Sequence, residues 1–323
     1  MDQRAVGISG LRVSELGLGT MTWGRDTDAV DAEAMLSDFL DAGGTFVDTA
    51  PGYGDGAAEE IIGSAIAGGV PRGELVIATK AGVRGLGGRA TVDASRATLL
   101  DSLDASLRRL GTDHVDLFLV QAPDPATPLA ETAHALRLAV ETGRTRYVGV
   151  SNFPGWLCAQ TAGILGDIGL TAVEHEYSLL QRGVEREVLP AGSAIGFGLL
   201  AWSPLGRGIL TGRYRNSTPA DSRGASPHLR PFVEPLLTER SFGIVEAVAR
   251  AAHGLETQPF EVALAWIRHR PGLASAIVGP RTPAQLRALL ASELEIPSVI
   301  LTALDDVSRP CIGYPERPRE QDG

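Results

Sequence analysis

Residues 93–121 read DASRATLLDSLDASLRRLGTDHVDLFLVQ. In the first part, 93–110, apolar residues recur every three or four positions, which is the spacing of an amphipathic helix. The second part, 115–121, is a short apolar run that ends in the polar residue Gln121, which is typical of a buried strand. This stretch therefore predicts a helix followed by a strand.

The same alternation continues in both directions along the chain. Short apolar runs occupy 16–19, 45–48, 75–80, 115–121, 145–150, 170–177, 196–202 and 275–279, and amphipathic stretches such as 29–42, 129–142 and 260–270 lie between them. Strands that alternate with helices, without a linker, indicate a parallel sheet. We therefore predict an α/β fold, a (β/α)8 TIM barrel, as a single domain over 1–308. A doubly wound open sheet is the alternative, but no GxGxxG motif follows an early strand.

Two segments depart from a plain barrel. Residues 207–238 are rich in Arg, Pro, Ser and Gly and form a long loop after the seventh predicted strand. Loops of this length often act as lids or binding loops. Residues 309–323 have the composition of a mobile C-terminal tail.

The composition excludes several classes of protein. The 323 residues are 44% hydrophobic with a net charge of −10, which argues against disorder and against nucleic acid as a partner. No apolar run is long enough for a membrane span, and the N-terminus lacks the apolar stretch of a signal peptide, so we expect no membrane partner and a cytoplasmic protein. The two cysteines form no metal-binding motif, Cys158 is more consistent with packing than with a nucleophile, and no metal is predicted.

One lysine is distinctive among the basic residues. Of the 29 Lys and Arg residues only Lys80 is a lysine, and the pKa of a lysine responds to burial and to neighbouring charges. Lys80 ends the third predicted strand, Asp48 ends the second, and Tyr53 follows in DTAPGYG. Catalytic residues of TIM barrels lie at the carboxyl ends of strands. An ammonium lowers the pKa of a nearby phenol and an Asp orients the ammonium, so the trio predicts proton donation to a carbonyl, with a cofactor supplying hydride.

The sequence resembles the aldo-keto reductases, which are NADPH-dependent (β/α)8 oxidoreductases. The stretches that carry the resemblance are GISGLRVSELGLGTMTWG at 7–24, FVDTAPGYG, VIATKAG, SLRRLGTDHVDLFLVQAPD, VGVSNF, EYSLLQRGVEREVLP, LLAWSPLGRGILTGRY and GPRTPAQL at 279–286. The sequence resembles in particular the long-loop bacterial branch, which is related to the potassium-channel β subunits. An oxidoreductase with a small-molecule substrate is what this resemblance implies.

The resemblance also implies the residues of a catalytic and a cofactor site. Asp48, Tyr53 and Lys80 match three members of the catalytic tetrad, with Tyr53 as the general acid, and Gln121 stands where the family has a histidine. Gln donates a hydrogen bond but cannot titrate. The implied contacts to NADPH are Thr20, Met21, Asp48, Ser151, Asn152, Glu174, Trp202, Ser203, Pro204, Leu205, Gly206, Arg207, Arg213, Gly279, Arg281 and Gln285. Among them, Arg281 is the implied charge partner of the 2′-phosphate, and Ser151 and Asn152 face the nicotinamide carboxamide.

Three cofactor positions depart from the family pattern. Glu174 replaces a Gln that contacts the carboxamide, and Ala288 and Leu289 replace an acidic residue and an Asn that hold the adenosine. Glu174 can still accept a hydrogen bond from the carboxamide nitrogen. The losses at 288 and 289 remove polar contacts worth about 1 kcal/mol each, which predicts looser cofactor binding.

Three functions are compatible with these residues. The first is NADPH-dependent reduction of the carbonyl of a small aldehyde, ketone or sugar-like substrate. The second is C=C (enoyl) reduction of an α,β-unsaturated ketone such as an NDP-4-keto-hexose, because in the family a change of the histidine accompanies double-bond reduction. The third is a cofactor-sensing binding protein, because the channel β subunits also lack the histidine. The complete trio of Asp48, Tyr53 and Lys80 favours an enzyme. The sequence does not predict an oligomeric state.

Overall fold

The computed structural model describes residues 1–84, 90–214, 224–226 and 228–310. Eight parallel strands form a closed barrel, namely β3 (Leu16–Gly19), β4 (Phe46–Asp48), β5 (Val76–Ala81), β8 (Val115–Val120), β9 (Thr145–Ser151), β10 (Ala172–Glu176), β11 (Gly198–Trp202) and β12 (Leu273–Val278). The barrel closes where β12 pairs with β3, with Ala276 opposite Leu16. The predicted TIM barrel is thus confirmed, and the open sheet is excluded.

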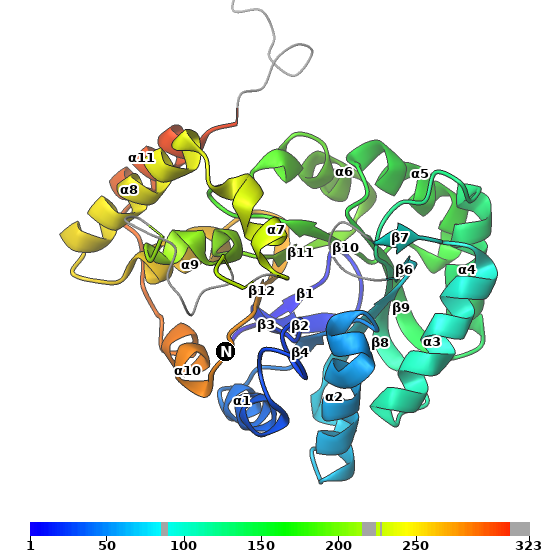
Figure 1. Ribbon diagram of the computed structural model, residues 1–323. Coiled ribbons are helices and arrows are strands. Elements are labelled where there is room, and N and C mark those ends of the chain that lie inside the picture. The colour runs from blue at the N-terminus through cyan, green and yellow to red at the C-terminus, as the bar shows by residue number, and fades with distance from the viewer. Residues whose placement is uncertain (85–89, 215–223, 227, 311–323) are drawn as a thin grey trace, which may run out of the picture.

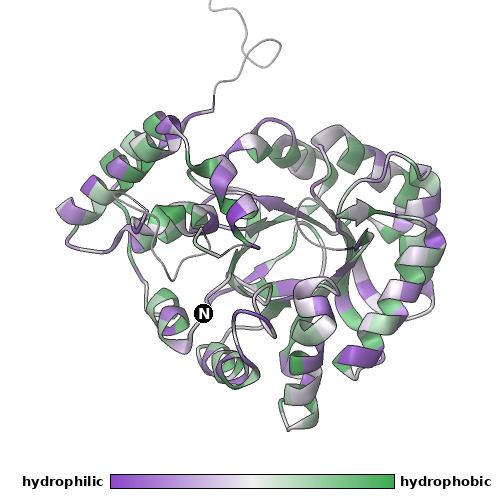
Figure 2. Ribbon diagram, viewed as in Figure 1, coloured by the Kyte–Doolittle hydropathy of each residue, from purple (hydrophilic) through white to green (hydrophobic). Residues whose placement is uncertain are grey.

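Helices surround the barrel (Figure 1). They are α1 (Ala29–Asp41), α2 (Ala57–Ala67), α3 (Arg96–Leu110), α4 (Leu129–Glu141), α5 (Gly155–Leu165), α6 (Val188–Ile195), α8 (Glu239–Gly254), α9 (Pro259–Arg268), α10 (Pro283–Leu290) and α11 (Ser298–Ser308). Figure 2 shows hydrophobic and hydrophilic residues interspersed along these helices, as expected for helices with one packed side. Among the described residues, none of the helices is long and apolar enough to span a membrane.

Local signals at both ends define α3, the helix of the opening sequence. The Ser95 hydroxyl accepts a hydrogen bond from the Thr98 amide at the start of the helix. Gly111 ends the helix with a φ of 63°, in the left-handed region that glycine adopts readily. Because Leu99, Leu103 and the other buried residues of α3 lie on one side, the helix packs against the barrel as its periodicity predicted.

The interior of the barrel changes from apolar to polar along its axis. Successive side chains of a strand alternate in direction, so residues two apart point the same way. A buried apolar cluster contains Phe46, Ala78, Ala172 and Leu200 together with Val6, Leu11 and Val13 from around the antiparallel pair β1 (Gln3–Ala5) and β2 (Arg12–Ser14). Two residues further along the same four strands stand Asp48, Lys80, Glu174 and Trp202. The hairpin thus covers the amino-terminal end of the barrel, and the polar residues occupy the carboxyl end.

The connection after β11 is long, as predicted, since α8 begins only at Glu239. Its described parts include the short helices η6 (Gly206–Thr211), α7 (Arg230–Val233) and η7 (Glu234–Leu236). Figure 1 shows α7 close to β11 at one end of the barrel. Residues 215–223 and 227 of this loop, and the predicted tail beyond 310, lie outside the described residues.

A buried ion pair joins two outer helices to the barrel wall. Glu59 of α2 is fully buried, and its carboxylate accepts hydrogen bonds from Thr79 Oγ1 of β5 at 2.6 Å and from Arg109 Nε of α3 at 2.7 Å. A buried carboxylate that loses its cation is strongly destabilising. This contact therefore contributes to stability and joins α2 and α3 to β5.

We predict that Arg109→Met lowers the free energy of unfolding by about 3 kcal/mol, because Glu59 would stay buried without a cation. Arg108→Met is the matched control, since Arg108 is exposed on the same turn and its replacement should change stability by less than about 0.5 kcal/mol. Urea unfolding followed by circular dichroism measures both. Equal losses in the two variants would contradict a specific role for the Glu59–Arg109 pair.

Candidate active site

Asp48, Tyr53 and Lys80, which the sequence predicted to act together, meet at the carboxyl end of the barrel. Lys80 Nζ lies 2.5 Å from Asp48 Oδ1 and 3.4 Å from the Tyr53 hydroxyl, at the start of the short helix η1 (Tyr53–Gly56). The ammonium also donates to the main-chain oxygen of Thr49 at 3.2 Å. The exposed fractions are 3% for Asp48, 9% for Tyr53 and 1% for Lys80. The three groups thus form one buried hydrogen-bonded cluster.

Glu174 joins this cluster from β10. Its Oε1 lies 3.4 Å from Lys80 Nζ, and the residue is 3% exposed. Its other oxygen, Oε2, is buried and has no hydrogen-bond partner within the described part of the chain. The ammonium of Lys80 therefore lies between two carboxyl groups, one of which keeps an unused acceptor.

Burial controls the protonation of this cluster. Burial raises the pKa of Tyr53 above its usual value; the Lys80 ammonium opposes this rise but does not cancel it, and the carboxyl groups of Asp48 and Glu174 add to it. The net shift of the Tyr53 pKa is opposite to the lowering that the ammonium alone predicts. Burial acts to lower the pKa of Lys80, but Asp48 and Glu174 outweigh it, so the pKa of Lys80 is raised.

The surroundings of Glu174 favour the protonated form of its carboxyl group. Burial, and next the negative charge of Asp48, raise the pKa of Glu174 to about 8, although Lys80 opposes the rise. The protonated form of Glu174 is thereby favoured, and Asp48 is the closer partner of the Lys80 ammonium.

A second polar network lies beside the cluster. The Asn152 amide Nδ2 donates to the main-chain oxygen of Gln121 at 2.9 Å, and Trp202 Nε1 donates to Asn152 Oδ1 at 3.3 Å. The Ser151 hydroxyl donates to the main-chain oxygen of Glu174 at 3.0 Å. Asn152 has a φ of 63°, a conformation uncommon outside glycine that concentrates at functional sites. These contacts hold Asn152, directly after β9, against the main chain after β8 and the Trp202 side chain at the end of β11.

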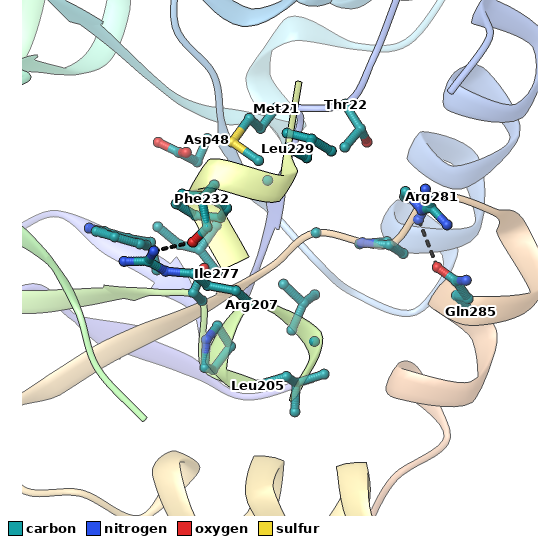
Figure 3. A pocket seen from close by; sticks show the side chains of 18 of the residues that line it. Met21, Thr22, Asp48, Leu205, Arg207, Leu229, Phe232, Ile277, Arg281 and Gln285 are labelled. Atoms are coloured by element: carbon teal, nitrogen blue, oxygen red, sulfur yellow. Dashed lines mark hydrogen bonds between the residues drawn. The ribbon is translucent and has the colours of Figure 1, made fainter. Parts of the chain in front are cut away.

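The two networks open into one cavity of about 1010 Å³. Its volume is at the upper end of ligand pockets, which span roughly 300–1,000 Å³, so it has room for a dinucleotide. In Figure 3, Asp48 lies on one side of the cavity and Arg281 and Gln285 on the other. The predicted site residues that line it are Met21, Asp48, Tyr53, Lys80, Gln121, Ser151, Asn152, Glu174, Trp202, Ser203, Pro204, Leu205, Arg207, Arg213, Gly279, Arg281 and Gln285.

Two predicted cofactor residues do not line the cavity. The Thr20 hydroxyl is fully buried and donates to the main-chain oxygen of Asp48 at 3.0 Å. Gly206 has a φ of 56°, and a Cβ built there would lie 2.7 Å from the Leu180 side chain. Neither residue therefore faces the cavity, and each supports the residues beside it that line the wall.

Arg281 stands at the start of α10, on the side of the cavity away from Asp48. Its main-chain nitrogen donates to the side-chain oxygen Oε1 of Gln285 at 2.9 Å (Figure 3). The Thr282 hydroxyl caps the helix by accepting a hydrogen bond from the main-chain nitrogen of Gln285 at 3.3 Å. Among the residues that the structure describes, no acidic side chain pairs with the Arg281 guanidinium. A helix N-terminus beside an arginine is a favourable place for a phosphate group.

Sequence reasoning missed the contribution of α7 to the cavity. The ring of Phe232 stacks on Trp202 with centroids 6.0 Å apart, and Leu229 and His228 also line the cavity. The Arg207 guanidinium lies 4.2 Å from the Phe232 ring centroid and bonds both carboxylate oxygens of Glu176, at 2.7 and 2.6 Å. In the sequence, only the length of the loop at 207–238 indicated that a segment after β11 would contribute to the cavity. The side chain of Arg207 thus has a carboxylate partner where the resemblance implied pyrophosphate.

Other reactive residues near the barrel lie outside this arrangement. His175 points away from its neighbours on β10, and its Nε2 lies 2.6 Å from the main-chain oxygen of Phe153. Burial raises the pKa of the Cys158 thiol to about 12, which is unsuited to a nucleophile. Among the described residues, no group of three or more His, Cys, Asp or Glu side chains is arranged to hold a metal ion.

Comparisons with known proteins agree with this geometry. The model of the aldo/keto reductase family matches residues 15–308. An uncharacterized oxidoreductase of Bacillus subtilis (strain 168) is 36% identical, over 95% of this chain and 96% of its own length. A probable voltage-gated potassium channel subunit beta of Oryza sativa subsp. japonica is 33% identical over 98% of both chains. The L-glyceraldehyde 3-phosphate reductase of Escherichia coli (strain K12) is 33% identical, over 88% of this chain and 86% of its own.

Proposed function

This chain belongs to the aldo/keto reductase family, and we propose that it is an NADPH-dependent reductase of the carbonyl group of a small aldehyde, ketone or sugar-like substrate. The observation that carries the proposal is the buried contact of Lys80 with both Asp48 and Tyr53 inside a cavity of dinucleotide size. Relatives named as an oxidoreductase and as an L-glyceraldehyde 3-phosphate reductase support it.

The side chains of the cavity fit a nicotinamide dinucleotide. The buried, unpartnered Oε2 of Glu174 can accept a hydrogen bond from a carboxamide, with Ser151 and Asn152 close by. Arg281 and the N-terminus of α10 would hold a phosphate on the ribose, which favours NADPH over NADH. When bound, the reduced nicotinamide supplies the hydride.

The residues of the cluster would perform the proton chemistry. Tyr53 gives its hydroxyl proton to the carbonyl oxygen as that oxygen gains negative charge. Because burial raises the pKa of Tyr53, its phenol is protonated at neutral pH, and the Lys80 ammonium at 3.4 Å stabilises the phenolate that forms. Asp48 keeps the ammonium charged and oriented at 2.5 Å. Gln121 lines the cavity and orients the substrate oxygen as a hydrogen-bond donor.

We predict that Arg281→Ala weakens NADPH binding by about ten- to a hundredfold and leaves NADH binding nearly unchanged, because only NADPH carries the 2′-phosphate. The control is Arg287→Ala on the same helix, where the arginine pairs with Asp38 and does not line the cavity. Titration of tryptophan fluorescence gives both dissociation constants. Equal affinities of the unmodified protein for NADPH and NADH would refute the assignment of Arg281.

We predict that Tyr53→Phe lowers carbonyl reduction by about 100- to 10,000-fold while NADPH affinity stays within a factor of about three, because the hydroxyl acts on substrate and not on cofactor. Tyr147→Phe, outside the cavity, should retain full activity. Steady-state assays at saturating NADPH compare the variants. If Tyr53→Phe lost cofactor binding and turnover together, Tyr53 would be structural and the mechanism would fail.

Two other functions remain as candidates. The presence of Gln121 at the cavity, in a position where the family has a titratable ring, favours C=C reduction of an α,β-unsaturated ketone as the second reaction. Similarity to the channel β subunit is compatible with a cofactor-sensing protein of little turnover. The retained Lys80–Tyr53 contact argues for turnover.

Gln121→His distinguishes the two reductions. For a carbonyl reductase the change should raise aldehyde turnover, and for an enoyl reductase it should lower enone reduction and raise carbonyl reduction. A ring donor beside Tyr53 would draw the carbonyl carbon toward the nicotinamide, and a displacement of about an ångström is enough to change which carbon reacts. One enone is offered to both proteins, and mass spectrometry and NMR identify the reduced carbon. Unchanged rates and products would show that position 121 does not govern the reaction.

A further inference from the structure

The cluster around Lys80 holds more acidic groups than its single cation can balance. Lys80 faces Asp48 from β4, Glu174 from β10 and Tyr53 from η1, and all of them are buried. On the strand of Glu174 itself, His175 points away and Glu176 is bound to Arg207 of η6. With both Asp48 and Glu174 ionised, the buried cluster would carry a net charge of −1, which is unfavourable away from water.

Glu174 is the group of this cluster that can respond to a ligand. Asp48 lies 2.5 Å from the ammonium, whereas Glu174 lies 3.4 Å from it, so Glu174 is the more weakly held of the two carboxyl groups. Its Oε2 is buried, has no partner among the described residues, and belongs to a residue that lines the cavity. A buried polar atom without a partner is costly and points to a ligand that completes its contacts.

The charge of the proposed ligand changes during the reaction. A reduced nicotinamide ring is neutral and an oxidised ring carries a positive charge. For Tyr53 to protonate the substrate oxygen, the ring must lie close to the cluster that holds Glu174. A positive charge nearby favours the ionised form of a carboxyl group, most strongly in a low-dielectric cavity.

We propose that Glu174 is a proton store whose state follows the redox state of the bound nicotinamide: it keeps its proton beside the reduced ring and releases it beside the oxidised ring. The inference rests on the proposed function, because it requires a nicotinamide in the cavity. It assigns to Glu174 a proton-holding role in addition to any hydrogen bond with the carboxamide.

The contacts of Lys80 give this proton a route to Tyr53. After Tyr53 has protonated the substrate, its phenolate takes a proton from the Lys80 ammonium at 3.4 Å, and the neutral amine takes the proton of Glu174 at 3.4 Å. The net change is one proton moved from Glu174 to Tyr53, with the ammonium restored. Gln121 cannot supply this proton because an amide does not titrate. Solvent reprotonates Glu174 once the oxidised cofactor has left.

The test is the ratio of the dissociation constants of NADP⁺ and NADPH for the full-length protein between pH 6 and pH 9. Both ligands carry the same 2′-phosphate, so the pH dependence that comes from ionisation of that phosphate cancels in the ratio. Since burial raises the pKa of Glu174 to about 8, NADP⁺ must displace a proton below that pH. We expect the ratio to fall by up to about tenfold per pH unit as pH rises toward 8, and to level off above it.

Two variants separate the proton of Glu174 from its other contacts. Glu174→Gln keeps the size and the acceptor oxygen, and its ratio should be independent of pH. Glu176→Gln is the matched control, since it removes a carboxylate from the same strand that has its own cation, and it should keep the pH dependence. Calorimetry in two buffers of different ionisation enthalpy counts the protons, and NADP⁺ should release close to one more proton than NADPH near pH 7 only when Glu174 is present.

The outcomes are distinct. If neither cofactor binds, the proposed function fails and the inference fails with it. If both bind but the ratio for the unmodified protein is the same at every pH, the proton store is refuted and the proposed function stands. If the ratio for Glu176→Gln were independent of pH, like that for Glu174→Gln, the pH dependence would come from the negative charge of the strand and not from Glu174 itself. Because the unmodified protein alone can give the refuting result, the test does not depend on the folding of a variant.

Discussion

The ammonium of Lys80 is the interaction on which the polar end of the barrel depends. Two carboxyl groups and a phenol are buried there, and an ionised carboxylate at this depth would be costly without a cation in contact. Lys80 reaches Asp48, Glu174 and Tyr53 from one inward position on β5. A guanidinium, with its wide planar fork, would not occupy the space of this compact charge. That difference gives a physical reason for one lysine in a chain that otherwise uses arginine.

Much of this arrangement could be predicted because it follows from local patterns. Strands buried on both faces are apolar runs with polar ends, so the run at 16–19 has the bounds of β3 and the run at 115–121 exceeds β8 by one residue. The proximity of Asp48 and Lys80 follows from their places at the ends of neighbouring strands. The family was recognisable from the same stretches, since the matched region spans 15–308.

The features that escaped prediction depend on contacts across the barrel or on the course of a long loop. Glu174 reaches Lys80 from β10, which is not a neighbour of β5, so strand adjacency gave no signal for that contact. The stacking of Phe232 on Trp202 requires α7 to fold back from the loop after β11. The direction of the Tyr53 pKa shift depends on how deeply the phenol is buried. The sequence motifs indicate which charged residues lie near the phenol, but they do not indicate how far it is removed from water.

The two departures at Gln121 and Glu174 have a common physical meaning when considered together. Where the resemblance implies a titratable ring at the end of strand four and an amide on strand six, this chain has an amide and then a carboxyl group. Gln121 therefore has no dissociable proton, whereas the carboxyl group of Glu174 has one and contacts Lys80 directly. Glu176, two residues further on β10, is bound by Arg207 beneath the Phe232 ring, so it does not compete for the ammonium. One strand thus presents two carboxyl groups in different surroundings: Glu174 is buried beside Asp48 and Lys80, and Glu176 is held by the guanidinium of Arg207.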